Sequence, residues 1–174
     1  MNHLEISHQL HRQNRRVRVQ ALNTNGQYAL EHLETVLSKN GECNRLSPDE
    51  LTIDYAAPPR NMDLESVLQA SSPISALRDI VKNWKVHGES QTHILLNGAF
   101  SFDFAAVFED LPEGQNDTLE FPDFAFWLPD EIVEIDHKNQ STAIRKLIFG
   151  GQSAPHVYTA PKQRLAELKA SCLE

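Results

Sequence analysis

Polar and apolar side chains alternate in several short stretches of this chain of 174 residues. Such alternation is typical of β-strands that bury one face and leave the other in water. It is clearest at 17–21 and 51–55, and 124–128 and 132–136 follow the same pattern on either side of a bend at Pro129. The full set of predicted strands is 4–7, 17–21, 51–55, 93–97, 100–104, 124–128, 132–136 and 143–149.

Two longer segments place apolar residues every three or four positions, as on one face of an amphipathic helix. The first is predicted over about 27–40, with Gly41 as its C-terminal stop. The second begins at Ser72 as N-cap, has Pro73 in its first turn, and carries its apolar face as far as Trp84.

Shorter helices complete the pattern. One helical turn is expected at 105–110, and a last helix from Pro161 onward, after a linker-like stretch rich in small residues. This order of elements predicts an α+β fold of mostly antiparallel strands, with two crossing sheets and amphipathic helices packed on them. We expect one domain over 1–150, and a linker with the start of a further helix over 151–174.

Charge excludes some classes of partner. The net charge of −8 argues against nucleic acid, because neutralising phosphates requires a basic surface. Residues 86–137 hold twelve Asp or Glu and no Lys or Arg, whereas Arg12, Arg15, Arg16 and Arg18 cluster near the N-terminus. With no apolar run long enough to cross a bilayer and no signal-peptide pattern, we expect a cytoplasmic protein without membrane contact.

No residue pattern in the chain predicts a metal or a nucleophile. Cys43 and Cys172 lack ligand spacing and are interpreted as reduced thiols, and His8 and His11 do not form a zinc motif. Ser101 has neither a nucleophile elbow nor an evident base.

Two carboxylates leave an alternative open. Asp103 and Glu109 could approach each other across a strand-to-helix turn for acid–base work or to bind a divalent cation. We favour a structural role, in which they cap the short helix and bond the loop backbone. The neighbouring aromatic stripe is interpreted as sheet core and consists of Phe100, Phe102, Phe104, Phe108, Phe124, Phe126 and Trp127.

Four segments, in the same order, resemble the N-terminal domain of anthranilate synthase component I, the chorismate-binding subunit. The most distinctive one reads Gly98-Ala-Phe-Ser-Phe-Asp103, followed by Phe108-Glu109-Asp110-Leu-Pro112, where the family typically has Gly-x-Phe-Ser-Tyr-Asp and Phe-Glu-Asp-Leu-Pro. The others are Phe121-Pro122-Asp123-Phe-Ala-Phe-Trp127, Glu131-Ile-Val-Glu-Ile-Asp136-His137 and the strand and turn over 17–26. The family-motif positions are therefore Gly98, Ser101, Phe102, Asp103, Phe108, Glu109, Asp110, Pro122, Asp123, Asp136 and His137.

The resemblance implies a supporting role. In the family, chemistry takes place in a larger C-terminal domain, which needs Mg²⁺ and forms anthranilate and pyruvate from chorismate with ammonia derived from glutamine. We therefore expect no catalytic, cofactor or metal residue in this chain, and expect it to contact the catalytic domain and the glutamine amidotransferase subunit. The acidic stretch supports this expectation, because a dicarboxylate such as chorismate needs cationic or N–H donors.

The sequence leaves alternatives to this role. The chain could be an autonomous binding or regulatory module derived from the family, or the same domain of aminodeoxychorismate synthase. Residues 4–7, Leu-Glu-Ile-Ser, look like the family's Leu-Leu-Glu-Ser motif for feedback tryptophan, but they lie too close to Val17 and are interpreted as a strand. Self-association through the last helix, around Leu165 and Leu168, is also expected.

Overall fold

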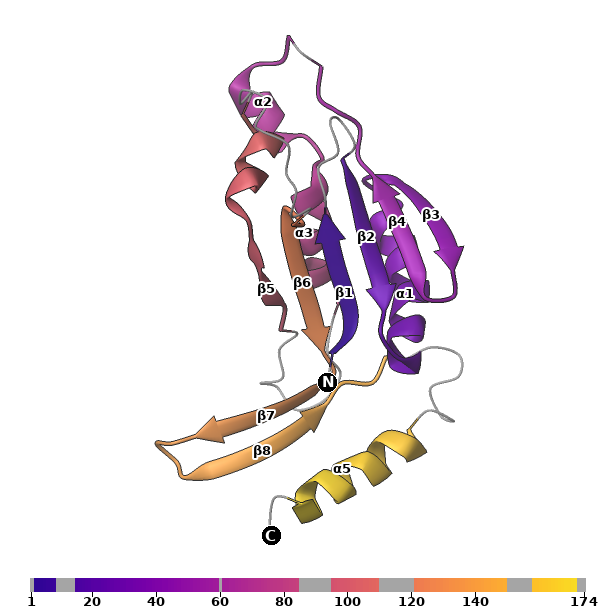
Figure 1. The fold of residues 1–174 in the computed structure, drawn as a ribbon, viewed down its shortest axis with the longest axis vertical. Coiled ribbons are helices and arrows are strands. Elements are labelled where there is room, and N and C mark those ends of the chain that lie inside the picture. Colours follow the sequence, from indigo (N-terminus) through magenta and orange to yellow (C-terminus); the bar gives the residue numbers. More distant parts are fainter. Residues whose placement is uncertain are drawn as a thin grey trace.

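A six-stranded antiparallel sheet forms the body of the protein (Figure 1). The computed structural model describes residues 2–8, 15–59, 61–84, 95–109, 121–149 and 158–171. The strands of this sheet, in spatial order, are β3 (Glu42–Ser47), β4 (Glu50–Asp54), β2 (Arg16–Ala21), β1 (Asn2–His8), β6 (Phe124–Pro129) and β5 (Asn97–Phe100).

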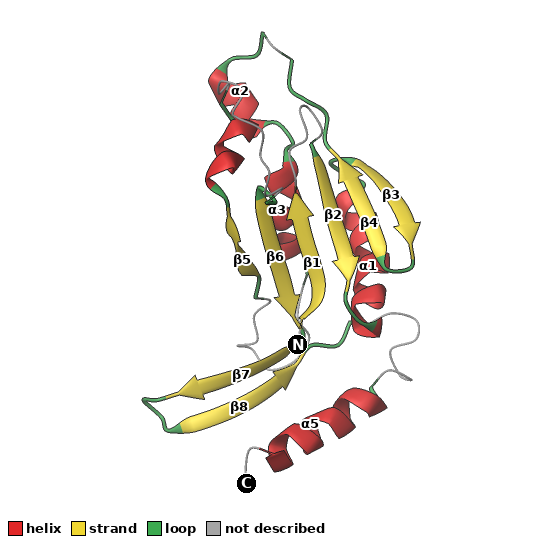
Figure 2. Cartoon of the chain, in the orientation of Figure 1, coloured by secondary structure: helices red, strands yellow, loops and turns green. Residues whose placement is uncertain are grey.

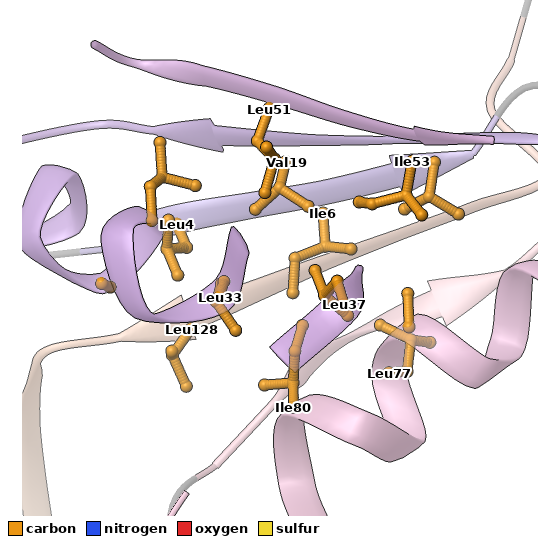
Figure 3. Close-up of a cluster of buried hydrophobic side chains, with 14 of the residues drawn as sticks. Leu4, Ile6, Val19, Leu33, Leu37, Leu51, Ile53, Leu77, Ile80 and Leu128 are labelled. Atoms are coloured by element: carbon orange, nitrogen blue, oxygen red, sulfur yellow. The ribbon is translucent and has the colours of Figure 1, made fainter. Parts of the chain in front are cut away.

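Two helices cover one face of this sheet, α1 (Thr24–Leu37) and α3 (Pro73–Asn83), and both lie behind it in Figure 2. Register explains which side chains meet them, since directly opposed residues of paired strands share a face. Ile6 lies opposite Val19, and Val19 lies opposite Leu51. Figure 3 shows these side chains converging on Leu33 and Leu37 of α1 and on Leu77 and Ile80 of α3. Each fully buried Leu or Ile contributes about 1.5–3 kcal/mol of transfer free energy.

The opposite face of the sheet is polar, as the alternation predicts. Arg16 donates two hydrogen bonds to Asp54, at 2.7 and 2.8 Å, and Arg18 donates two to Glu50, at 2.7 and 3.2 Å. Arg16 and Arg18, two members of the arginine cluster near the N-terminus, therefore form cross-strand ion pairs on this face.

The two predicted amphipathic helices are confirmed, with one shifted boundary. α1 begins at Thr24 rather than near residue 27, because the Asn23 side chain accepts a hydrogen bond from the Gly26 N–H at 2.9 Å and so caps the helix earlier. α3 has the predicted Ser72 N-cap, whose N–H donates to Ser75 Oγ at 3.1 Å.

Two elements were not predicted. β3 has a mostly polar sequence, and it forms because it is the hairpin partner of β4. Helix α2 (Leu64–Gln69) is too short for a periodicity to show, and Asp63 caps it by accepting from the Ser66 N–H at 3.0 Å.

The predicted strand at 100–104 was wrong beyond its first residue. β5 ends at Phe100, and the chain turns into a 3-10 helix, η1 (Phe102–Val107). Residues 93 and 94 of the predicted strand at 93–97 lie outside the described residues, and the described part was wrong for 95 and 96, since β5 begins only at Asn97. The strand expected at 143–149 is shorter and earlier, as β8 (Ser141–Lys146).

A second antiparallel sheet consists of β7 (Glu131–Asp136) and β8, and it lies across the foot of the main sheet in Figure 1. Helix α5 (Thr159–Ser171) lies alongside this hairpin, and Leu165 and Leu168 are only half-buried. The predicted α+β class with two antiparallel sheets is confirmed, while the division at residue 150 and self-association stay predictions. None of the described helices has the length and apolar character needed to span a membrane.

Candidate functional site

The family-like motif begins where β5 and β6 approach each other at Gly98. A Cβ atom at this position would lie 2.1 Å from the Ala125 carbonyl oxygen and 2.6 Å from Phe126 Cα. Both are backbone atoms of β6, so no side-chain rotation could relieve the contact. The glycine is therefore required by the close approach of a neighbouring backbone, as glycines within strands often are.

A backbone hydrogen bond then extends the β5–β6 ladder into the motif. The Ser101 N–H donates to the Asp123 carbonyl at 2.7 Å, one step beyond the Phe100–Phe124 pair. Ser101 Oγ is buried and has no hydrogen-bond partner in the part of the chain that is described. Among the described residues, no base hydrogen-bonds this hydroxyl, as an activated nucleophile would require.

Aromatic rings fill the space beneath this ladder. The ring centroids of Phe104 and Phe124 lie 5.5 Å apart in an edge-to-face arrangement, and those of Phe104 and Phe108 lie 5.5 Å apart in the same way. Such pairs stabilise a core beyond the area they bury. Phe104 and Phe124 are buried, and Phe108 and Phe126 pack against them.

The prediction that the whole aromatic stripe is core was wrong for three residues. Trp127 is only half-buried and lies opposite Glu5, on the polar face of the sheet. The Phe102 side chain is 91% exposed and Phe100 is 46% exposed. The prediction assumed strand alternation, which places residues 100, 102 and 104 on one face. The 3-10 helix changes the direction of the chain at Phe102, so that Phe104 turns inward and Phe102 outward.

Asp103 and Glu109 are both exposed, at opposite ends of η1. The structure places Ser101, not Asp103, at the N-cap, so the predicted capping role was wrong for Asp103. Asp103 lies one residue inside, in the first turn, where a negative charge is favourable but only weakly so at the surface. The geometry does not gather these carboxylates into an acid–base pair with a buried environment.

We expect Asp103→Ala to change the free energy of unfolding by less than about 0.5 kcal/mol, since the side chain is exposed. Asn23→Ala is the matched comparison and should cost about 1 kcal/mol, because it removes a helix cap that is present. Urea unfolding of both variants measures the difference. Equal losses would show that Asp103 has a structural role that its position does not explain.

The other motif positions lie at separate places. Pro122 is half-buried and Asp123 is buried beside Ser101, whereas Asp110 lies outside the described residues. Asp136 and His137 lie far along the chain, at the end of β7 and in the turn to β8, respectively. There the Asp136 carboxylate accepts from the N–H groups of Asn139 and Lys138, at 3.0 and 2.9 Å, and these bonds, with one from the Asn139 side chain, lower its pKa. His137 is exposed.

A polar cluster that the sequence pattern did not predict joins this hairpin to helices α1 and α5. Lys146 Nζ lies 3.1 Å from Asp130 Oδ2 and 2.8 Å from Glu131 Oε1, and Arg164 of α5 lies 3.5 Å from the same Glu131 oxygen. Asn25, in the first turn of α1, donates to the Leu147 carbonyl at 2.8 Å and to Asp130 at 3.3 Å. We call Asn25, Asp130, Glu131, Lys146 and Arg164 the polar joint.

Burial and hydrogen bonding shift the pKa values of the charged groups in the polar joint. Burial by itself would lower the pKa of Lys146, but its hydrogen bonds to Glu131 and Asp130 outweigh burial and raise it. The hydrogen bond from Lys146 lowers the pKa of Glu131, against the opposing effect of burial. A hairpin with its turn at 137–140 has a register that places Glu131 opposite Lys146, so this pair could have been predicted from the sequence.

In the described parts of the chain, no group of three or more His, Cys, Asp or Glu is placed to hold a metal ion. His8 lies in β1, whereas His11 and Cys172 fall outside the described residues; burial raises the pKa of the Cys43 thiol, which favours an inert thiol. What the motif does is bring β5, η1 and β6 together.

Comparison with curated proteins gives relatives for most of the chain. A protein of Haemophilus influenzae named anthranilate synthase component 1 is 28% identical over 145 residues, which are 81% of this chain and 27% of that protein. The protein of the same name from Vibrio cholerae is 27% identical over 150 residues, 86% of this chain and 28% of its own length. That of Escherichia coli is 31% identical over 133 residues, 76% of this chain and 25% of its own length.

No protein-family model matches the chain. The chain spans about a quarter of the length of these curated relatives. The resemblance inferred from the motifs is thus confirmed, and the chain is a relative of an N-terminal-type portion of anthranilate synthase component 1.

Proposed function

We propose that this chain acts as the non-catalytic N-terminal part of an anthranilate synthase component 1 in tryptophan biosynthesis. The observation that carries the proposal is the similarity to proteins of that name, which extends over 76–87% of the chain. The names of these relatives favour anthranilate synthase over aminodeoxychorismate synthase.

In this proposal the chain supports chemistry that occurs elsewhere in the complete enzyme, which forms anthranilate and pyruvate from chorismate with ammonia from glutamine. A bracing role is supported by Gly98, which permits the close approach of β5 and β6, by the hydrogen bond from Ser101 to Asp123, and by Phe108, which packs against the core. The complete enzyme uses Mg²⁺. Among the described residues, no group of three His, Cys, Asp or Glu is placed to bind a metal ion, so we assign no catalytic step that needs Mg²⁺ to this chain. Contact with an amidotransferase subunit and a contribution to feedback inhibition by tryptophan belong to the same proposal.

A chimera tests the proposal. The matching quarter of the E. coli relative is replaced by this chain, and anthranilate formation from chorismate and ammonia is followed by fluorescence. We expect the chimera to form anthranilate and the isolated chain to form none, because the described residues hold neither a metal-ligand cluster nor a set of cationic anchors in the motif.

The same exchange with the matching quarter of the H. influenzae relative is the positive control. If that chimera is active and the chimera with this chain is folded but inactive, the proposal fails. Turnover by the isolated chain would instead show that catalytic residues lie within it. If the chain is instead an autonomous module, neither the chimera nor the isolated chain should form anthranilate. Adding the isolated chain should then leave the activity of the E. coli enzyme unchanged.

A further inference from the structure

Two phenylalanines stand almost fully in solvent at one end of the main sheet. Phe102 is 91% exposed and Phe121 is 74% exposed. They belong to the same end of the β5–β6 ladder, because the hydrogen bond from Ser101 to Asp123 is its last rung, and Phe102 follows Ser101 while Phe121 precedes Asp123. We call this pair the aromatic patch.

The aromatic patch has no role in the core of the described structure. Phe104 and Phe124 already fill the space beneath the ladder, and Phe102 points away from them. A phenylalanine carries about 150–250 Å² of surface, so the two side chains expose on the order of 300 Å². Single exposed apolar residues are ordinary, whereas two exposed phenylalanines at one end of a sheet reach the size of the largest apolar patch on a typical monomer, and such patches are often functional.

The position of the patch favours access by a large partner. β5 is the edge strand of the sheet, and all four of its residues are exposed. Within the described parts of the chain, β5 pairs only with β6, so its outer edge is not covered by another strand. A protein surface can therefore approach the patch from the side of the sheet.

Charge around the patch decides what kind of partner it fits. Two exposed carboxylates lie near Phe102 in sequence: Asp103 is the second residue of η1, and Glu109 lies two residues beyond the end of that helix. The sequence has no Lys or Arg between 86 and 137, so no cation of this segment offsets them. Nucleic acid and anionic lipid would be repelled, and a second copy of the same patch would bring like charges together.

We infer that the aromatic patch is a docking site for a protein surface with an apolar centre and a rim of Lys or Arg. In such an interface the aromatic side chains supply the desolvated centre. The acidic residues around them set orientation and exclude anionic partners. This inference does not rest on the proposed function, because it follows from exposure and charge alone.

Two short amphipathic peptides serve as probes. Both carry leucines at helical spacing, and they differ only in having Lys or Glu at the remaining positions. Binding of each labelled peptide to the full chain is measured by fluorescence anisotropy. We expect the Lys peptide to bind about tenfold or more tightly than the Glu peptide, and its binding to weaken as salt is added.

Three variants separate the apolar and ionic contributions. Phe102→Ser with Phe121→Ser should weaken binding of the Lys peptide by about tenfold or more, and Asp103→Asn with Glu109→Gln should reduce the preference for Lys over Glu. Leu46→Ser with Leu68→Ser is the matched control, since both leucines are exposed elsewhere, at 61% and 52%, and should leave binding unchanged. All the substituted side chains are exposed, and circular dichroism checks that each variant keeps the fold.

Equal binding of the two peptides would overturn the inferred partner chemistry. Binding that survives the double Phe substitution, or that falls equally in the Leu control, would overturn the location. Failure of the Lys peptide to bind at all would overturn both. None of these results bears on whether the chimera of the proposed function is active, so the two proposals can fail separately.

Discussion

Replacing Lys146 with methionine is expected to lower the free energy of unfolding by about 3–5 kcal/mol. Methionine keeps much of the length of the side chain but removes the charge that lies 3.1 Å from Asp130 and 2.8 Å from Glu131. The Asp130 side chain is 1% exposed, so its carboxylate loses a cationic partner where water cannot replace it. Chemical denaturation followed by circular dichroism measures the loss.

Arg145→Met is the matched control for this prediction. Arg145 precedes Lys146 on the same strand and pairs with Glu134 at 2.8 Å, but both side chains are partly in solvent. Exposed ion pairs contribute about 0–1 kcal/mol, so this variant should be only slightly less stable. Similar losses in the two variants would show that burial of the polar joint is not what makes Lys146 important.

The pH dependence of the free energy of unfolding should reflect the same ion pair between Lys146 and Glu131. The pKa of Glu131 is lowered in the folded protein, so its contribution is present above its unfolded pKa and is lost as the pH falls through the folded value. The pKa of Lys146 is raised, so its contribution is present below its ordinary pKa and is lost as the pH rises through the folded value. In Lys146→Met, the part of the alkaline loss that belongs to Lys146 should disappear.

Gly98→Ala is expected to destabilise the protein by about 3 kcal/mol or more. The added methyl group would lie 2.1 Å from the Ala125 carbonyl oxygen, so β5 and β6 would have to separate where Ser101 and Asp123 are held together. Because the aromatic core lies directly beneath, we also expect altered near-ultraviolet circular dichroism. Thermal unfolding and this spectrum are the measurements.

Gly41→Ala provides the comparison for the glycine prediction. A Cβ atom there would meet Ile53 Cγ2 at 2.6 Å and the Asp54 carbonyl oxygen at 3.0 Å. The nearest atom belongs to the side chain of buried Ile53 rather than to the backbone, so the cost should be smaller than at Gly98, about 1–2 kcal/mol. If Gly98→Ala proved as mild as Gly41→Ala, the close approach of β5 and β6 would not be a requirement of the fold.

Local pattern was sufficient to predict much of the fold. Strands such as 17–21 and 51–55, and the helix capped at Ser72, follow from periodicity and from capping residues, which act over a few positions. Gly98 could be assigned a close approach or a bulge because a glycine within a strand pattern commonly marks one of these two features. The family likeness rests on the same kind of information, since it consists of short segments in a constant order.

Only the tertiary structure decided the features that depend on residues far apart in the chain. β3 has little apolar pattern of its own and exists because β4 pairs with it. Asp130 meets Asn25 although 105 positions separate them, because the hairpin returns to the start of α1. Phe102 was predicted to be core by alternation, and the chain turns there because Phe104 and Phe124 fill the core beneath η1. Periodicity describes one segment at a time, whereas burial and ion pairing depend on which segments pack together.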